Sequence, residues 1–498
     1  MKNIVEYLKY YAEHTPNKTA IISGDEYFSY SAVWSKVKAL ATAITDLHLV
    51  NKPIIVKVER NAETILSFFG VLASGNYYVP VDSCITQEKF KSIIETSGAK
   101  HVIFTSQSSQ GENEGCSEIK TLDFASLVNA EINNKQFSAE FDNKFVLPCD
   151  ENAPIYLIYT SGSTGEPKGV LKTHKNMLSF VDNFIATFGM DSSEVIANQA
   201  PFSFDASAKD IYLALRVGAT LVIPPKQLFL FPTKLIEYLN ANKVTFICWV
   251  PSALTLIVRT KALTFVKPTT LKRIFFVGEV FQPKYLNVFL KELPDVEYYN
   301  LYGSTEIAGV CAYYKIGTQK LLAEDRAIPI GIALKNNIVY LDDGEICVIS
   351  EQFALGYVND AEKNAKVFTL NDQGQRVLRT GDFATYDEYG NLVFISRKDF
   401  QIKHMGYRIE LQEIELAITA LTYVSSSACV YDNVHEKIIA FVVLNEALAD
   451  GIKILLTDIK AKLQLYMVPN KIVLLDDMPL NTNGKTDRQK LMIEIERE

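Results

Sequence analysis

Residues 159–170 read YTSGSTGEPKGV and directly follow a short apolar run, residues 154–158 (PIYLI). These positions hold four glycine or proline residues, five hydroxyl side chains and one lysine, Lys168. Glycines let the backbone approach a ligand closely, hydroxyls donate hydrogen bonds, and a lysine neutralises negative charge. The segment therefore predicts a strand followed by a loop that wraps an anion such as a polyphosphate. It is not a Walker A loop, because Lys168 lies between Pro167 and Gly169, whereas that motif has glycine before the lysine and Ser or Thr after it.

Short apolar, β-branched runs alternate along the chain with longer segments of helical period. Residues 53–58 (PIIVKV) and 273–277 (RIFFV) are two of the runs, and residues 209–217 are a helical segment closed by Gly218. This alternation predicts an α/β fold built from layered, largely parallel sheets. At about residues 330–397 the pattern changes to short strands separated by Asp-Gly and Tyr-Gly turns, which predicts a small antiparallel barrel or sheet.

The last hundred or so residues carry helix and strand signals of their own. Residues 410–421 have apolar positions at helical spacing, and residues 437–443 (KIIAFVV) are typical of a strand. We therefore predict a large N-terminal core, residues 1–397, and a small, mobile α+β C-terminal domain, residues 398–498. A chain of 498 residues is long enough for more than one domain at roughly 150 residues each.

Composition and charge narrow the class of protein further. Hydrophobic residues make up 48% of the chain and charged residues 22%, which is typical of a globular protein rather than a disordered one. The formal net charge of −8 provides no basic surface for nucleic acid or an anionic membrane. The amino terminus lacks the apolar stretch of a signal peptide, and no run reaches the roughly 20 apolar residues that span a bilayer. Seven scattered cysteines without a CxxC pair fit a reducing compartment, so we expect a cytoplasmic protein with no nucleic-acid or membrane partner.

Four further motifs follow the loop in order. They are residues 300–306 (NLYGSTE), 379–382 (RTGD), 397–410 (RKDFQIKHMGYRIE) and 479–488 (PLNTNGKTDR). Together with residues 159–170 they resemble the signature of the AMP-forming adenylating enzymes, the acyl- and aminoacyl-adenylate-forming superfamily. Residues 75–82 (GNYYVPVD) resemble the form found in amino-acid-activating members, stand-alone amino acid–carrier protein ligases among them. Ser304 and Ser396 depart from the family's usual proline and glycine.

The resemblance implies ATP as the bound nucleotide, with Mg²⁺ as its metal ion. Tyr302 offers an aromatic face for adenine, Thr305 can hydrogen-bond the α-phosphate, and Glu306 is the kind of hard oxygen ligand that Mg²⁺ prefers. Asp382 would accept hydrogen bonds from the ribose hydroxyls with help from Arg397, although each could instead belong to an ordinary surface ion pair. The implied ATP-binding residues are Thr160, Ser161, Gly162, Ser163, Thr164, Gly165, Lys168, Gly278, Glu279, Asn300, Leu301, Tyr302, Gly303, Ser304, Asp382 and Arg397.

Lys485 lies in an Asn-Gly-Lys sequence, which predicts a turn that projects the side chain from a loop. When a carboxylate oxygen attacks the α-phosphate, negative charge gathers around phosphorus and the bridging oxygen, and a fixed ammonium stabilises that transition state. The resemblance implies that Lys485 is this ammonium and that Thr305 and Glu306 complete the catalytic set. The alternative is a lysine that is only a solvated surface charge.

The acid to be activated is indicated by residues 204–207 (FDAS). In the amino-acid-activating members that this chain resembles, the aspartate of such a stretch holds the α-ammonium, and here it is Asp205. An acid without an amino group would leave this carboxylate unpaired, at a cost of about 1–3 kcal/mol or more. Alternatively, Asp205 is the N-cap of a helix that starts near Ala206. The implied substrate pocket comprises Asp205, Ala206, Lys209, Cys248, Phe275, Val277, Leu301, Gly309 and Val310.

Lys209 is an exception in this otherwise largely apolar pocket. It lies one helical turn from Asp205, on the same face of the predicted helix. It could pair with the side-chain carboxylate of a substrate such as glutamate, or it could only neutralise Asp205 or Asp210. The structural roles are the preferred interpretation.

A second half-reaction follows from the resemblance, because an adenylate hydrolyses unless it is handed on. The acceptor would be a phosphopantetheine thiol on a carrier protein. In the family the C-terminal domain rotates about a hinge, which Asp399 matches, and presents the loop around Gly406; Gly406 could instead be only a turn glycine. Since the chain ends 13 residues after Lys485, we expect the carrier protein to be a separate molecule.

Two other functions stay open from the sequence. A CoA ligase for a small carboxylic acid would carry similar ATP motifs, but Asp205 and residues 75–82 favour an amino acid. A regulatory protein that binds ATP without chemistry is disfavoured by the intact Lys485, Glu306 and Asp382. The sequence does not determine which amino acid or stereoisomer is activated.

Overall fold

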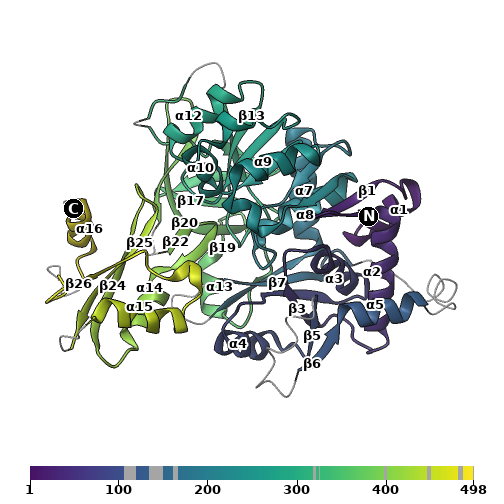
Figure 1. Ribbon diagram of the computed structural model, residues 1–498, viewed down its shortest axis with the longest axis horizontal. Helices are drawn as coiled ribbons and strands as arrows, with labels where there is room; N and C mark the ends of the chain where they lie inside the picture. The colour runs from purple at the N-terminus through teal and green to yellow at the C-terminus, as the bar shows by residue number, and fades with distance from the viewer. Residues whose placement is uncertain are drawn as a thin grey trace. The chain divides into compact units, whose positions relative to one another are not determined.

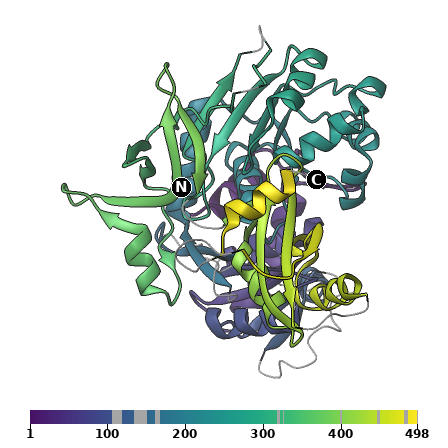
Figure 2. The same ribbon diagram turned by 90° about the vertical axis from the view of Figure 1, so that its left-hand side faces the viewer.

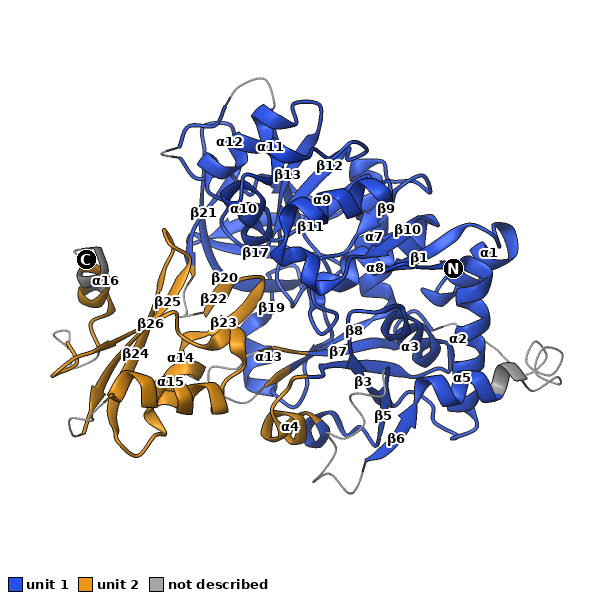
Figure 3. Cartoon of the chain, viewed as in Figure 1, with its two compact units in different colours: residues 1–83, 94–158, 169–396 blue, residues 84–93, 159–168, 397–498 orange. Residues whose placement is uncertain are grey.

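The computed structural model describes residues 1–105, 119–133, 150–160, 167–317, 321–324, 326–397, 401–445, 450–479 and 486–496. The chain divides into two compact units (Figure 3). The large unit comprises residues 1–83, 94–158 and 169–396, and the small unit comprises residues 84–93, 159–168 and 397–498. Within the described ranges, no helix is long and apolar enough to cross a membrane.

One sheet of the large unit has nine strands (Figure 1). They are β1 (Thr19–Ser23), β2 (Glu26–Ser29), β9 (Val195–Ala197), β10 (Thr220–Ile223), β11 (Phe246–Trp249), β12 (Arg273–Val277), β13 (Glu297–Tyr302), β14 (Ala312–Ile316) and β15 (Ile332–Ala333). Their order in space is β15-β14-β13-β12-β11-β9-β10-β1-β2. The strands from β13 to β1 pair in parallel, and antiparallel pairs flank them on both sides. The predicted α/β class with largely parallel sheets is confirmed.

The second sheet of the large unit has seven strands in the order β18-β8-β7-β4-β3-β5-β6. They are β3 (Pro53–Val58), β4 (Tyr77–Asp82), β5 (His101–Phe104), β6 (Lys120–Asp123), β7 (Pro154–Thr160), β8 (Lys168–Thr173) and β18 (Gly356–Tyr357). β7 contains the strand predicted at residues 154–158, in front of the glycine-rich segment of residues 159–170, and it neighbours β8. The segment therefore connects two adjacent strands of one sheet.

Some helices of the large unit begin at a residue whose side chain caps their free amide groups. The helices of this unit are α1 (Val5–His14), α2 (Tyr30–Thr45), α3 (Ala62–Ala73), α5 (Phe124–Asn133), α7 (His174–Phe188), α8 (Asp205–Val217), α9 (Pro232–Ala241), α10 (Pro251–Arg259), α11 (Ala262–Phe265), α12 (Pro283–Glu292) and α13 (Ala361–Val367); α4 (Gln87–Ser97) begins in the small unit. α7 starts with a reciprocal capping box between Thr173 and Asn176. α8 ends, as predicted, at Gly218, whose φ of 69° is the left-handed conformation that glycine adopts easily.

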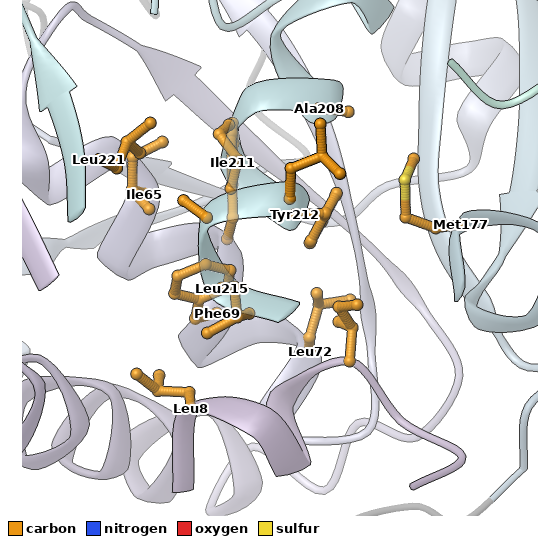
Figure 4. Packing of buried hydrophobic residues seen from close by; sticks show 14 of the residues in the cluster. Leu8, Ile65, Phe69, Leu72, Met177, Ala208, Ile211, Tyr212, Leu215 and Leu221 are labelled. Atoms are coloured by element: carbon orange, nitrogen blue, oxygen red, sulfur yellow. The ribbon is translucent and has the colours of Figure 1, made fainter. Parts of the chain in front are cut away.

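The largest hydrophobic cluster described in the large unit surrounds α8. Ala208, Ile211, Tyr212 and Leu215 of this helix are buried among residues of α1, α3, α7 and β10 (Figure 4). Burying a side chain of this kind is worth about 1.5–3 kcal/mol. The packing holds α8 firmly, and with it the aspartate at its first position.

A five-stranded antiparallel sheet occupies the region for which the sequence predicts a small barrel or sheet (Figure 2). Its strands are β16 (Ile338–Asp342), β17 (Glu345–Ile349), β19 (Phe368–Leu370), β20 (Arg376–Tyr386) and β21 (Leu392–Arg397). β16 and β17 are joined by Asp343 and Gly344, both with positive φ, as a two-residue hairpin requires. This sheet carries Asp382.

The small unit is an α+β structure with its own core. A hairpin of β22 (Gln401–His404) and β23 (Tyr407–Glu410) precedes α14 (Leu411–Thr419), and a three-stranded sheet of β24 (Val424–Asp432), β25 (Lys437–Leu444) and β26 (Lys471–Leu474) packs with α15 (Gly451–Lys462) and α16 (Arg488–Glu496). Gly406 stands with Met405 in the turn of the hairpin, at a φ of 83°. Gly406 is therefore a turn glycine, as the sequence allows.

His174 makes the stability of the large unit dependent on pH. Its Nδ1 accepts a hydrogen bond of 3.3 Å from the Ile4 amide, and burial lowers its pKa from 6.5 to about 4. The unfolded chain binds a proton on this histidine between those pH values and the folded chain does not, so stability falls as the pH falls from about 6.5 to 4, by about 3 kcal/mol in total. We expect His174→Gln to remove this part of the pH dependence of thermal unfolding followed by calorimetry. The exposed His14, replaced in the same way, is the control, and equal pH slopes for His174→Gln and wild type would contradict the prediction.

Candidate active site

Asp205 is the first residue of α8, and two buried side chains hold its carboxylate. The Tyr156 hydroxyl and the Lys172 ammonium each donate a hydrogen bond of 2.6 Å to Asp205 Oδ1. The residue in front of the helix is Phe204, and no side chain caps this helix start. The N-cap role considered for Asp205 is therefore wrong, because its oxygen faces β7 and β8 rather than the amide groups of its own helix.

Lys172 changes the charge balance that the sequence suggests for Asp205. Its side chain is 0% exposed near the end of β8, and its Nζ also donates to the Ile307 carbonyl at 3.4 Å. Desolvation lowers the pKa of Lys172, while the Asp205 and Glu306 carboxylates act in the opposite direction. Since Asp205 has a counter-ion within the protein, the expectation that an acid without an amino group leaves it unpaired is wrong.

Three buried tyrosines, Tyr156, Tyr78 and Tyr212, lie next to one another beside Asp205. The Tyr78 and Tyr212 hydroxyls are hydrogen-bonded at 2.8 Å, and the ring of Tyr156 lies 5.6 Å from that of Tyr78, centroid to centroid. Desolvation raises the pKa of Tyr156 and Tyr78 well above 10, so both stay protonated donors. Sequence reasoning missed Tyr156 and Lys172. The available signal was a lysine directly after the apolar residues Val170 and Leu171, because a buried lysine needs a partner.

Lys209 has a structural partner. Its Nζ donates to Asp210 Oδ1 at 2.7 Å and to the Cys248 carbonyl at 3.1 Å, and its side chain is 2% exposed. Asp210 also accepts a hydrogen bond of 3.0 Å from Asn198 through its second oxygen. Of the roles that the sequence allows, pairing with Asp210 is the one observed.

We expect Lys209→Met to leave the ranking of amino-acid substrates unchanged. The lysine serves Asp210 and a backbone carbonyl, so its loss should weaken the packing of α8 and slow reaction with all amino acids alike. Pyrophosphate exchange with a panel of amino acids, compared between wild type and variant, measures this. A selective loss for aspartate or glutamate would show instead that Lys209 reads an acidic side chain.

The other implied pocket residues come from neighbouring elements of the nine-stranded sheet. Cys248 pairs with Phe275 across β11 and β12, and Val277 pairs with Leu301 across β12 and β13. Cys248, Phe275, Leu301 and Val310 belong to one buried apolar cluster, and the partly buried Val277 packs against it. Ala206 follows Asp205 on α8. A Cβ at Gly309 would lie 2.3 Å from the Phe180 ring, so this position has no room for a side chain.

Two residues implied in nucleotide binding meet although they belong to different sheets. The Tyr302 hydroxyl, at the end of β13, donates a hydrogen bond of 2.5 Å to Asp382 Oδ2 on β20. Both side chains are buried, and desolvation raises the pKa of Tyr302 well above 10. The bond fixes the tyrosine ring relative to the carboxylate. The sequence places the two residues in separate motifs and gives no sign of this contact.

The segment after β13 fits a phosphate-bearing ligand. A Cβ at Gly303 would lie 2.5 Å from the Gly309 carbonyl oxygen, so only glycine allows this close backbone path. The next residue, Ser304, has a buried hydroxyl without a hydrogen-bond partner in the described part of the chain. Asn300 donates to the Pro329 carbonyl at 2.8 Å, and Glu279 accepts from the Ser252 amide at 2.9 Å, next to Gly278 with its φ of 100°.

Glu306 has a buried carboxylate that accepts a hydrogen bond from a tyrosine. The Tyr357 hydroxyl, on β18, donates a hydrogen bond to Glu306 Oε1. Among the residues that the structure describes, no group of three or more His, Cys, Asp or Glu side chains could hold a metal ion by itself. This donor set fits Mg²⁺, which commonly takes one or two carboxylates and completes its shell with phosphate and water oxygens. Thr305 directly precedes Glu306 in this segment.

Several predicted site residues lie outside the described ranges: Ser161, Gly162, Ser163, Thr164, Gly165, Asp399 and Lys485. Thr160 and Lys168, which border the glycine-rich segment, are described, and the Thr160 hydroxyl donates to the Lys168 carbonyl at 3.4 Å. Arg397 is the last residue of β21.

Two models of known protein families match the chain. The model of the AMP-binding enzyme family matches residues 8–358, and that of the AMP-binding enzyme C-terminal domain matches residues 413–485. The D-alanine–D-alanyl carrier protein ligase of Bacillus mycoides (strain KBAB4) is 31% identical over 519 aligned residues, which cover 99% of each chain. The crystal structure of IdnL1 has a TM-score of 0.79 at 25% identity, covering 96% of this chain and 98% of that one. The Vibrio cholerae adenylation domain AlmE, solved with glycyl-adenosine-5'-phosphate, shares the fold with a TM-score of 0.84 at 20% identity, covering 99% of this chain and 97% of that one.

The chain belongs to the AMP-binding enzyme family. It is an ATP-dependent ligase that forms AMP, as its motifs predict. The predicted membership of the adenylate-forming superfamily, and the amino-acid adenylation branch as the nearest resemblance, are likewise confirmed.

Proposed function

We propose that the protein activates an amino acid with ATP to give an aminoacyl-AMP and pyrophosphate, and then transfers the aminoacyl group to the phosphopantetheine thiol of a separate carrier protein. The full-length similarity to a D-alanine–D-alanyl carrier protein ligase supports this proposal. So does Asp205, whose side chain is 12% exposed and whose Oδ1 is held by protein donors. Its second oxygen, Oδ2, accepts no hydrogen bond from the described residues and is available to a substrate ammonium.

In the first half-reaction a substrate carboxylate oxygen attacks the α-phosphorus of ATP, and the bond from that phosphorus to the oxygen shared with the β-phosphate breaks. Asp205 orients the substrate through its ammonium, and the apolar surface of Phe275, Val277 and Val310 receives the side chain. The Lys485 ammonium stabilises the charge that develops at phosphorus. Mg²⁺, held by Glu306, would neutralise phosphate oxygens.

The nucleotide lies, in this proposal, along the segment from Asn300 to Glu306. Tyr302 offers its ring to adenine while its hydroxyl stays bonded to Asp382, and Asp382 accepts hydrogen bonds from the ribose. Thr305 and Ser304 have hydroxyls for the phosphate groups, together with Lys168 and the residues 160–165 of the glycine-rich segment. The proposed ATP-binding residues also include Gly278, Glu279, Leu301 and Arg397.

In the second half-reaction a thiol sulfur attacks the carbonyl carbon of the adenylate, and the bond from that carbon to the AMP oxygen breaks. Residues 1–397 form the core that binds ATP and the amino acid, and residues 398–498 form the mobile domain. Asp399 is the hinge between them. The hairpin turn at Gly406 is presented to the phosphopantetheine arm after the hinge has turned.

Pyrophosphate exchange tests the first half-reaction directly. The full chain is incubated with ATP, Mg²⁺, labelled pyrophosphate and each common L- and D-amino acid in turn. We expect label to enter ATP with one amino acid or a small group of them, and not in their absence. Exchange that depends only on acids lacking an amino group would favour a CoA ligase instead. If no acid supports exchange, the protein binds ATP without this chemistry.

A further inference from the structure

Lys172, the partner of Asp205, has no role in the proposed activation of an amino acid. Lys172 lies on β8 with its side chain fully enclosed, and its ammonium contacts Asp205 Oδ1 at 2.6 Å. The same ammonium contacts the carbonyl of Ile307, the residue after Glu306, at 3.4 Å. Lys172 therefore joins the start of α8 to the segment that carries Glu306, and it neutralises Asp205 before any substrate arrives.

The second buried lysine–aspartate pair of this region shows what is unusual about the first. In the pair of Lys209 and Asp210, both aspartate oxygens are occupied, Oδ1 by Lys209 and Oδ2 by Asn198. In the pair of Lys172 and Asp205, Tyr156 and Lys172 both donate to Oδ1, and no described residue donates to Oδ2. The first pair thus supplies a compensated charge and one vacant acceptor position. Tyr156, which donates to Asp205, belongs to the same apolar cluster as Cys248, Phe275 and Val310.

A vacant acceptor on a compensated carboxylate needs a hydrogen-bond donor but not a positive charge. An α-ammonium at Oδ2 would be the second cation on one carboxylate, so repulsion from Lys172 offsets part of its attraction. A hydroxyl on the α-carbon donates one hydrogen bond to the same oxygen without that repulsion. Without Lys172, a neutral donor would leave the buried charge of Asp205 uncompensated, which is what normally excludes such acids.

We propose that the protein also adenylates 2-hydroxy acids, with Lys172 as the residue that admits them by neutralising Asp205. The inference rests on the proposed function, because it assigns a second substrate class to the same pocket. The same bonds form and break as in the activation of an amino acid. A carboxylate oxygen attacks the α-phosphorus, pyrophosphate leaves, and a 2-hydroxyacyl-AMP forms. The substrate hydroxyl keeps its proton and donates it in a hydrogen bond to Asp205 Oδ2.

The test is pyrophosphate exchange with matched pairs of acids. The amino acid that gives the fastest exchange is compared with the 2-hydroxy acid of the same side chain and configuration, in wild type, Lys172→Met and Lys172→Arg. Methionine is close to lysine in length and carries no charge. Lys209→Met is the matched control, since it removes an equally buried lysine whose partner is Asp210 rather than Asp205.

We expect wild type to use the hydroxy acid with a kcat/KM within about 100-fold of that for the amino acid. The gap between the two acids is the ratio of these kcat/KM values, and Lys172→Met should widen it at least about tenfold. Lys172→Arg and Lys209→Met should leave the gap as it is in wild type. Exchange with the amino acid but none with the hydroxy acid in wild type would overturn the inference, as would an unchanged gap in a folded Lys172→Met. If Lys172→Met does not fold, the wild-type comparison alone decides. Exchange with the hydroxy acid and no amino acid would uphold the inference and refute the proposed function.

Discussion

Replacing Lys485 by alanine is expected to slow aminoacyl-AMP formation by about 10²- to 10³-fold, the usual cost of losing one fixed group that stabilises developing charge. The lysine belongs to the family's C-terminal motif, and the match to the C-terminal domain model extends to this residue. The effect should fall on kcat rather than on the KM for ATP, because the ammonium acts on charge that develops during the attack. Pyrophosphate exchange at saturating ATP measures the rate.

Two comparisons make this expectation specific. Lys490→Ala removes an exposed lysine five residues further on, on α16, and should leave the exchange rate within about twofold of wild type. Transfer to a thiol from an aminoacyl-AMP prepared in advance should survive in Lys485→Ala, since that step forms no bond to phosphorus. Exchange at the wild-type rate in Lys485→Ala would mean that this lysine is only a solvated charge.

Replacing Glu306 by glutamine is expected to weaken the apparent affinity for Mg²⁺ by more than about 100-fold. The carboxylate would supply the charged oxygen for the ion, and the amide of glutamine is a poorer ligand. Tyr357→Phe removes only the hydroxyl that orients this carboxylate, so we expect an intermediate effect of about tenfold. The measurement is the exchange rate as a function of Mg²⁺ concentration at fixed total ATP.

Glu351→Gln is the control for this series, because that glutamate is 70% exposed and pairs with a surface lysine. Its Mg²⁺ dependence should equal that of wild type. A half-saturating Mg²⁺ concentration unchanged in Glu306→Gln would remove Glu306 from the metal site. A larger effect for Tyr357→Phe than for Glu306→Gln would likewise contradict the assignment.

Local signals in the sequence were sufficient for many elements of the fold. The runs at residues 53–58 and 273–277 are β3 and β12 with the bounds predicted, since β-branched apolar residues at a strand position carry their own signal. Gly218 ends α8 as predicted, because it adopts the left-handed conformation without strain. The change to short antiparallel strands was also visible, through turn residues such as Asp343 and Gly344.

The contacts inside the candidate site could not be predicted in the same way. Tyr156 and Lys172 stand 49 and 33 positions from Asp205 in the sequence, and Tyr302 stands 80 positions from Asp382. Such pairs depend on which elements become neighbours, and a local pattern does not encode that. Motif resemblance named Asp205, Tyr302 and Asp382 but not the side chains that fix their charge and orientation. The roles of Lys485, Asp399 and residues 161–165 stay predictions.

An isotope experiment tests the central claim, that a substrate carboxylate attacks the α-phosphorus of ATP, most directly. The amino acid is labelled with oxygen-18 in both carboxylate oxygens, and hydroxylamine takes the place of the carrier thiol as acceptor. After turnover by the full chain, mass spectrometry should find one labelled oxygen in AMP and none in pyrophosphate, because the bridging oxygen stays with phosphorus when the acyl group leaves. Unlabelled AMP, or label in inorganic phosphate, would show that activation proceeds through another phosphorus and would contradict the account.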